Sequence, residues 1–222
     1  DIPMQRRDPD AGDINAGLRF SRYFGGVDLQ FVAISGLDFE PLGALSFDQG
    51  EPVIETFHKR RELYGVSAES SFGAIALRGE LAYSPERLFN TGAAPRLDTV
   101  ALDNWRGAIG VDINAPWNVF INLQFLYDEV SQAPADLVRD RVERVFTALF
   151  KRRFAYDTVD IEFRFYQSMA YRDRLLRGAL SYELSDTMTL KLAVENFQGD
   201  SRGPFGQFNQ RDQVSLTWEL TL

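Results

Sequence analysis

Apolar and polar residues alternate with a period of two along most of this chain, and this alternation constrains the fold more than any other feature. The last eleven residues, DQVSLTWELTL, show it most clearly. There, Val214, Leu216 and Trp218 alternate with Ser215 and Thr217. A period of two predicts a β-strand with one apolar face and one polar face.

The same pattern recurs and predicts about eleven strands. They are expected over residues 13–24, 27–33, 62–72, 75–83, 105–114, 119–127, 143–151, 159–165, 175–184, 190–194 and 212–222. Short turns alternate with long connections. The short turns are expected at 25–26, 72–74, 115–118 and 185–187, and the long connections are expected at 36–60, 85–103, 128–142 and 198–211. Short turns at one end and long loops at the other are typical of an outer-membrane β-barrel.

One segment, PADLVRDRVERVFTALFKRRF at residues 134–154, is ambiguous. Its apolar residues, among them Leu137, Val138, Val142 and Val145, have helical spacing. The alternation of short turns and long connections holds, however, only if residues 143–151 cross as a strand. We therefore expect a helical or irregular loop that leads into a strand.

The apolar face of these strands could meet a protein core or lipid. Small soluble barrels close with about eight strands around a narrow packed interior, so eleven strands need another arrangement. Aromatic residues gather near both strand ends: Tyr64, Tyr83, Trp105 and Tyr127 at the long-loop ends, and Tyr23, Phe72, Trp117 and Tyr182 near the short turns. Two such belts are expected at the two interfaces of a bilayer. The sequence therefore predicts an all-β fold, an antiparallel transmembrane β-barrel, with a soluble all-β binding protein as an alternative.

Several segments also carry a family resemblance. They are RFSRYFGGVDLQF, RGELAYS, GAIGVDINAPWNVFINLQFLYDEV, LLRGALSYELSDTMTLKLAVENFQG and FGQFNQRDQVSLTWELTL. Their pattern of strands and turns resembles the C-terminal half of a widespread family of poorly characterised outer-membrane β-barrel proteins of Gram-negative bacteria. The resemblance covers most of the chain and implies a location in the bacterial outer membrane, with no known enzymatic residues and no settled substrate. Members usually end in an aromatic residue, whereas this chain ends in Leu222.

The polar faces of the expected strands carry charges of both signs, and we expect them to face the lumen of the barrel. The expected lumen-lining residues are Arg78, Glu80, Arg106, Asp112, Glu162, Arg164, Arg177, Glu183, Lys191 and Glu195, with Arg19, Asp28, Glu69 and Glu219 in the same phase. We expect one polar cluster formed by Arg78, Glu80, Arg106 and Asp112. Opposite charges can pair across neighbouring strands, so these residues could line a path for a solute, brace the wall, or do both.

A basic run in one long connection consists of His58, Lys59, Arg60 and Arg61. At the outer rim of a barrel, such cations could contact lipopolysaccharide phosphates; the alternative is an ordinary solvated loop. His58 is the one histidine of the chain. It has no identifiable nucleophile or carboxylate beside it, so we expect no catalytic residues and no enzymatic activity.

Composition excludes several classes of site. The chain has no cysteine, which excludes disulfides, thiolate metal sites and cysteine nucleophiles. Its net charge of -8 argues against a nucleic-acid partner. No phosphate loop, dinucleotide fingerprint or zinc spacing occurs, so we expect no cofactor and no metal.

These expectations combine into a porin-like or transport channel for an unidentified small solute, with membrane lipid as its surroundings. A non-transporting barrel that scaffolds an outer-membrane complex is the alternative. Residues 1–11 are expected to be a loop or lead-in segment, and 12–222 the C-terminal portion of the barrel. Bacterial single-chain barrels have an even number of strands. We therefore expect further strands, from a missing N-terminal part of the same barrel or from a protein partner, to pair with 13–24 and 212–222.

Overall fold

The computed structural model describes residues 14–48, 51–92 and 97–221, and most of them lie in antiparallel β-strands. The strands are β1 (Ala16–Phe24), β2 (Val27–Leu37), β3 (Leu42–Asp48), β4 (Glu51–Phe57), β5 (Arg60–Phe72), β6 (Ile75–Thr91), β7 (Asp98–Ala115), β8 (Val119–Val130), β9 (Val142–Phe154), β10 (Val159–Ser168), β11 (Arg174–Ser185), β12 (Met188–Gln198) and β13 (Gln213–Leu220). A 3-10 turn, η2 (Gly206–Phe208), lies between the last two strands. No helix among these residues is long and apolar enough to cross a membrane.

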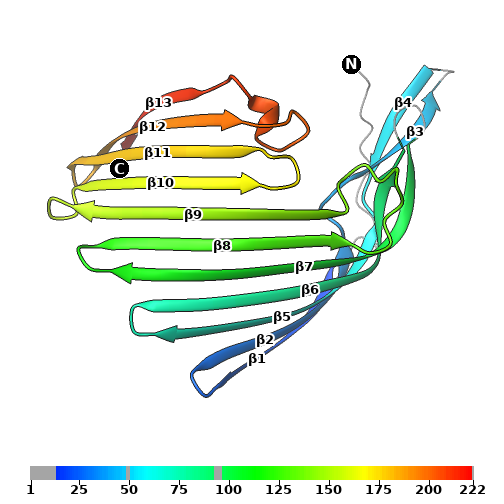
Figure 1. Cartoon of the computed structure of the whole chain (residues 1–222), viewed down its shortest axis with the longest axis horizontal. Helices are drawn as coiled ribbons and strands as arrows, with labels where there is room; N and C mark the ends of the chain where they lie inside the picture. Colours follow the sequence, from blue (N-terminus) through cyan, green and yellow to red (C-terminus); the bar gives the residue numbers. More distant parts are fainter. Residues whose placement is uncertain (1–13, 49–50, 93–96, 222) are drawn as a thin grey trace. The chain divides into compact units, whose positions relative to one another are not determined.

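Eleven of the strands form one sheet, in the order β1-β2-β5-β6-β7-β8-β9-β10-β11-β12-β13 (Figure 1). The remaining two, β3 and β4, pair only with each other. The predicted set of eleven antiparallel strands is confirmed, and the strand expected at 143–151 is β9. Over the described residues the sheet has β1 and β13 as its edges and is not closed as a barrel. The predicted lead-in at 1–11 and the terminal Leu222 lie outside the described residues.

The chain divides into two compact units, and the division passes through β5, β6, β7, β8 and β9. Unit 1 comprises Asp1–Ala68, Glu80–Gly107 and Asp128–Val142. Unit 2 comprises Glu69–Gly79, Ala108–Tyr127 and Glu143–Leu222. Unit 1 therefore contains the β1–β2 and β3–β4 hairpins, and unit 2 contains nearly all of β9 and the whole of β10 to β13.

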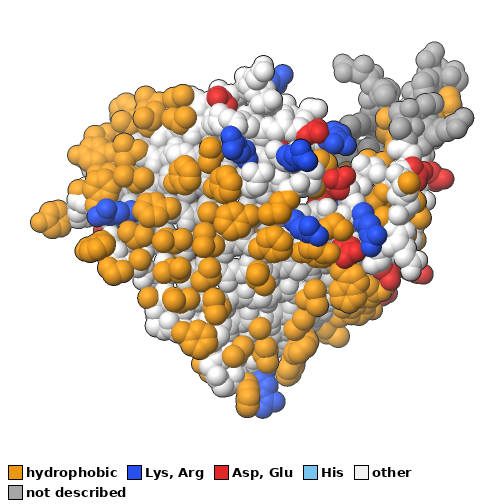
Figure 2. All heavy atoms as spheres, in the orientation of Figure 1, with side chains coloured by type: hydrophobic (Ala, Val, Ile, Leu, Met, Phe, Trp, Pro, Cys, Tyr) orange, Lys and Arg blue, Asp and Glu red, His pale blue; other side chains and the backbone are white. Residues whose placement is uncertain are grey.

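In unit 2, the register of β10 to β13 separates polar from apolar side chains. Residues directly opposite each other in an antiparallel pair share a face of the sheet. Arg164 lies opposite Arg177, which lies opposite Glu195 on β12. The other face carries rows of exposed apolar residues, one of which consists of Ile161, Leu180, Leu192 and Leu216. Hydrophobic side chains spread over this region in the space-filling view (Figure 2).

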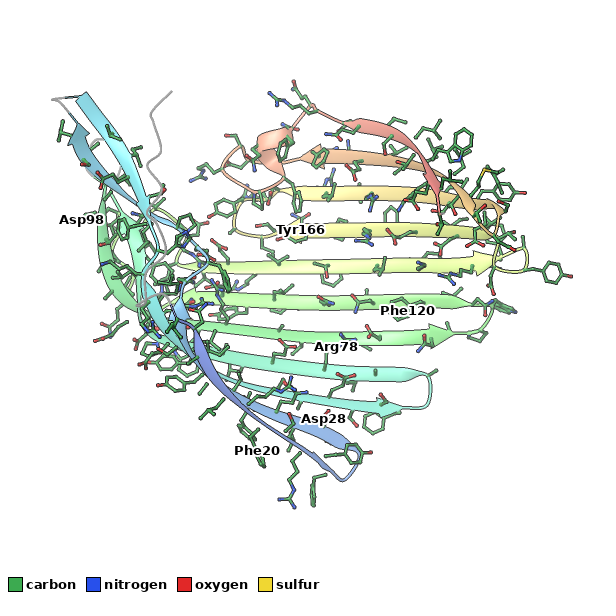
Figure 3. The ribbon with its side chains drawn as sticks, turned by 180° about the vertical axis from the view of Figure 1, so that it is seen from behind. Phe20, Asp28, Arg78, Asp98, Phe120 and Tyr166 are labelled. Carbon is green, nitrogen blue, oxygen red and sulfur yellow. The ribbon has the colours of Figure 1, made fainter. Side chains whose placement is uncertain are left out.

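In unit 1, the β1–β2 hairpin has the same two-sided character. Its turn is Gly25-Gly26, with φ of +59° and +87°, a conformation that a side chain would strain. Phe20 lies opposite Phe31, while Asp28 lies opposite Tyr23 on the alternate face. Phe20 and Asp28 accordingly project to different sides of the hairpin (Figure 3).

Three connections differ from the prediction. The sequence predicts a loop over 85–103, but β6 continues to Thr91 and β7 begins at Asp98. The 36–60 connection contains the β3–β4 hairpin, whose residues do not alternate cleanly.

The helical alternative for residues 134–141 is wrong, because the segment forms turns and a single bridge between Leu137 and Thr91. One backbone bond stays within the segment, from the Leu137 amide to the Pro134 carbonyl at 3.3 Å, and others join it to β6 and to the residue that follows β6. The amide of Val138 donates to the Asn90 carbonyl at 3.0 Å, and the amide of Gly92 donates to the Asp136 carbonyl at 2.7 Å. Tertiary hydrogen bonding therefore overrides the helical spacing here.

A break in the alternation of β6 decides where its last residues point. Glu86 has a φ of +46°, and a residue in this conformation within a strand is typical of a β-bulge. Ser84 and Arg87, three positions apart, are both buried, as expected if the bulge shifts the inward phase by one residue. Pro85 lies between them, and proline lacks the amide that a regular ladder needs.

Candidate functional site

The polar face of unit 2 is held by ion pairs between neighbouring strands. The Arg177 Nε lies 2.9 Å from the Glu195 carboxylate, and its Nη1 lies 3.6 Å from that of Glu162. Glu162 also pairs with Arg164 on its own strand at 2.7 Å. These four predicted lumen-lining residues therefore form one continuous network across β10, β11 and β12.

Arg78 and Asp112, also in unit 2, form a second ion pair. The Asn122 amide donates to the other oxygen of the same carboxylate, so β6, β7 and β8 are linked on their polar face. Arg78 is marked on that face, together with Phe120 (Figure 3).

A polar cavity of about 240 Å³ lies near the short turns of unit 2. Glu183 and Lys191, two further predicted residues, line it together with Glu219. Its charged and hydroxyl lining is completed by Lys151, Arg153, Asp157, Thr158, Asp160, Glu162, Ser181 and Thr189. Ala179, also in the lining, is buried.

In unit 1, Arg106 belongs to a different network from Arg78 and Asp112. Its Nε donates to Asp128 at 2.8 Å, and its Nη2 lies 3.2 Å from Glu40. Glu80 is exposed on β6 and takes part in no ion pair among the described residues. The structure thus places Arg78 with Asp112, and Arg106 with Asp128 and Glu40.

The predicted basic run, His58 to Arg61, makes contacts within unit 1. The His58 Nδ1 lies 2.7 Å from the Asp38 carbonyl oxygen, and Arg61 lies 3.5 Å from the Asp38 carboxylate. Arg60 donates to the Ile14 carbonyl at 2.8 Å, and the Lys59 Nζ lies 5.7 Å from the centre of the Phe57 ring. These contacts hold the run against a residue that precedes β1, the residue that follows β2 and the last residue of β4.

Arg87, which the sequence analysis does not single out, is the centre of the most buried polar group in unit 1. Its side chain is 2% exposed. Its Nε donates to Asp38 at 2.6 Å, its Nη1 donates to Asn104 at 3.1 Å, and its Nη2 lies 2.8 Å from Glu40. We call the group of Arg61, Arg87, Arg106, Asp38, Glu40, Asn104 and Asp128 the arginine cluster.

Two acidic residues of the arginine cluster come from a short segment after β2. Residues 38–43, here called the strap, run from the end of β2 into β3. The Asp38 amide donates to the Lys59 carbonyl at 2.8 Å. The Asn90 side chain closes the other end, accepting from the Gly43 amide at 3.0 Å and donating to its carbonyl at 2.6 Å. Side chains of β5, β6 and β7 thus fasten the strap.

The electrostatics of the cluster favour an ionised Asp38. Burial by itself raises the pKa of this carboxyl. The hydrogen bond from Arg87 and the positive charges of Arg87 and Arg61 outweigh burial, so the pKa of Asp38 lies below its ordinary value. The cluster therefore holds negative charge in a partly buried position.

One buried carboxylate in unit 2 organises the loops beyond β10 and β12. Asp173 is fully buried, and its Oδ2 accepts from the amides of Phe205 and Gly206 at 2.8 and 3.2 Å. The sequence offers no signal for this role, because the aspartate and its partners lie 32 and 33 positions apart. Arg87 does have a signal: Pro85 inside an otherwise regular strand indicates a bulge.

Among the described residues, no group of three or more His, Asp or Glu could hold a metal ion. A comparison with models of known protein families finds no match, and a comparison with curated proteins finds none either. The function must therefore be argued from the geometry of the sheet.

Proposed function

We propose that this chain forms the wall of a β-barrel in the outer membrane of a Gram-negative bacterium, and that the barrel is a channel for a polar solute. One observation carries the proposal: exposed apolar side chains occupy one face of the strands in both units, while the other face carries charge pairs such as Arg177–Glu195 in unit 2 and Arg106–Asp128 in unit 1. Contact with water is unfavourable for the apolar face, and contact with lipid is unfavourable for the charged face. A lipid exterior and a polar lumen satisfy both.

Aromatic residues at the long-loop ends of unit 1 support a membrane interface. Tyr83 and Trp105 pack with ring centres 4.5 Å apart. The hydroxyl of Tyr83 donates to Asp103 at 2.9 Å, and that of Tyr64 donates to Glu62 at 2.8 Å. The rings line an apolar groove of about 740 Å³ on the same surface. Rings in apolar surroundings with hydroxyls toward charged groups are the arrangement expected at headgroup level.

The short-turn end of unit 2 has its own exposed aromatic residues, including Trp117, Tyr156 and Trp218. Trp117 lies in the turn between β7 and β8 with a φ of +62°, so the chain keeps a large side chain at a position where glycine is easier to accommodate. Anchoring in the opposite interface explains why such a residue is used there. The basic run at 58–61 would then lie at the outer rim, near lipopolysaccharide.

A non-transporting barrel that scaffolds a protein complex is the second candidate. The edge strands β1 and β13 favour it, because every residue of both is exposed. An unpaired strand edge in lipid costs several kcal/mol for each unsatisfied group. Further strands, from the same protein or from a partner, are therefore part of either proposal.

Two measurements test the proposal on the intact protein. Sucrose-gradient fractionation of the producing bacterium should place it with outer-membrane markers, and planar bilayers with the purified protein should show discrete ion-conducting steps. A protein found in the soluble fraction would contradict the membrane assignment. Outer-membrane location without any conductance would contradict the channel and favour the scaffold.

A further inference from the structure

We propose that Arg61, Arg87 and Arg106 form a binding site for a small dicarboxylate, and that the strap fills this site with its own Asp38 and Glu40. The inference names a solute class for the channel and rests on the function proposed above. It starts from the way in which the strap is held.

Each carboxylate of the strap is shared by two arginines. Asp38 lies 2.6 Å from Arg87 and 3.5 Å from Arg61, and Glu40 lies 2.8 Å from Arg87 and 3.2 Å from Arg106. Arg87 bridges the two with different nitrogens of one guanidinium group. A planar guanidinium suits two carboxylates at once, which a lysine ammonium would not fix in this geometry.

The strap fills the site as a flexible ligand would. Asp38–Pro41 belong to no strand, so one backbone bond, from Asp38 to Lys59, and side-chain contacts hold this stretch in place of a β-ladder. The Glu40 side chain is 62% exposed and its partner Arg106 is 34% exposed. This half of the site is therefore open to solute, whereas Arg87 is covered. A dissolved dicarboxylate can compete at the open half first.

Displacement of the strap would leave a strongly anion-attracting wall. Without Asp38 and Glu40, the arginine cluster would keep three arginines and one carboxylate, Asp128, which pairs with Arg106 and also with Arg139. Positively charged walls with low-dielectric surroundings concentrate anions. The same wall would disfavour a small cation. The preference of the channel for anions over cations is therefore the property to measure.

The test uses the intact protein with the strap neutralised, Asp38→Asn with Glu40→Gln. The matched control, Glu55→Gln with Asp136→Asn, removes the same charge from exposed positions of unit 1 that take part in no ion pair among the described residues. Reversal potentials in a KCl gradient should shift toward chloride selectivity in the strap variant and not in the control. Succinate, the probe, should reduce its conductance at about tenfold lower concentration than in the unaltered protein, because the internal competitor is gone.

A second readout does not depend on conductance. Succinate should raise the melting temperature of the refolded strap variant and leave that of the control unchanged, since a ligand stabilises the folded state that binds it. If the double variant fails to fold, Glu40→Gln alone, at the exposed half of the site, should show the same shifts to a smaller degree.

The outcomes separate the two proposals. An absence of conductance in every protein, including the unaltered one, would overturn the proposed channel. The effect of succinate on the melting temperature would still show whether the dicarboxylate site exists. Equal shifts in the strap variant and the control, or a strap variant that is less stable yet indifferent to succinate, would show a structural brace and overturn the dicarboxylate site.

Discussion

Replacement of Arg87 by methionine should destabilise the protein by about 3–4.5 kcal/mol. The change keeps an unbranched side chain of similar length and removes the three contacts of the guanidinium group. The hydrogen bond to Asp38, whose side chain is 11% exposed, should contribute about 1.5–3 kcal/mol as a bond to a charged group, and the bond to Asn104 about 1 kcal/mol. Glu40 should add only about 0.5 kcal/mol, because it is mostly exposed and water screens its charge. The total agrees with the roughly 3–5 kcal/mol lost when a buried ion pair loses one partner.

Urea unfolding of the protein refolded into thin-bilayer vesicles measures this loss, with fluorescence of the three tryptophans as the signal. Glu40→Gln serves as the control and should cost less than about 1 kcal/mol. A double-mutant cycle of Arg87→Met with Asp38→Asn should show a coupling of about 2 kcal/mol. An Arg87→Met loss below about 1 kcal/mol, or one equal to that of Glu40→Gln, would refute the view that the buried half of the arginine cluster supports the fold.

Three further outcomes are expected. The pKa of Asp38 is lowered in the folded state, so its ionised form stabilises the protein above about pH 4. This stabilisation is lost as the pH falls through the lowered pKa. The difference in unfolding free energy between the unaltered protein and Asp38→Asn should therefore narrow below about pH 4. Leu216→Arg should lower the unfolding free energy in vesicles by about 2–4 kcal/mol if the apolar face of β13 meets lipid. Thr217→Arg, on the polar face, should lower the unfolding free energy by less, and equal losses would contradict the assigned faces. Asp173→Ala should speed proteolytic cleavage within residues 199–211, measured by mass spectrometry, because two backbone amides there lose their acceptor.

The eleven strands could be predicted because their signals are local. An alternating strand carries its phase in its own residues, and a turn such as Gly25-Gly26 marks a strand end within two positions. Opposite charges on adjacent strands, such as Arg177 and Glu195, could be anticipated as pairs from the same phase.

The arginine cluster could not be predicted, because its members come from segments that no local pattern connects. Asp38 and Arg87 are 49 positions apart. The regular alternation of β6 would also place Arg87 on the face of Tyr83, and only the bulge at Glu86 reverses this. Pro85 indicates a bulge, but a proline at the end of an alternating run fits the end of a strand equally well. The β3–β4 hairpin was missed because its two strands pair only with each other, so no outer face selects alternating residues.

The bulge at Glu86 makes the backbone conformation of one residue responsible for the facing of a whole strand end. Deletion of Glu86 would leave Ser84 and Arg87 two positions apart, so regular alternation would keep Arg87, Phe89 and Thr91 on the buried face. Straightening the bulge with Glu86 retained would instead carry these three residues to the opposite face. Gain or loss of a residue in a loop would have no such effect. When sequences of this kind are aligned, a gap at Glu86 therefore keeps the buried residues of β6 in register, whereas a gap between Arg87 and Thr91 does not.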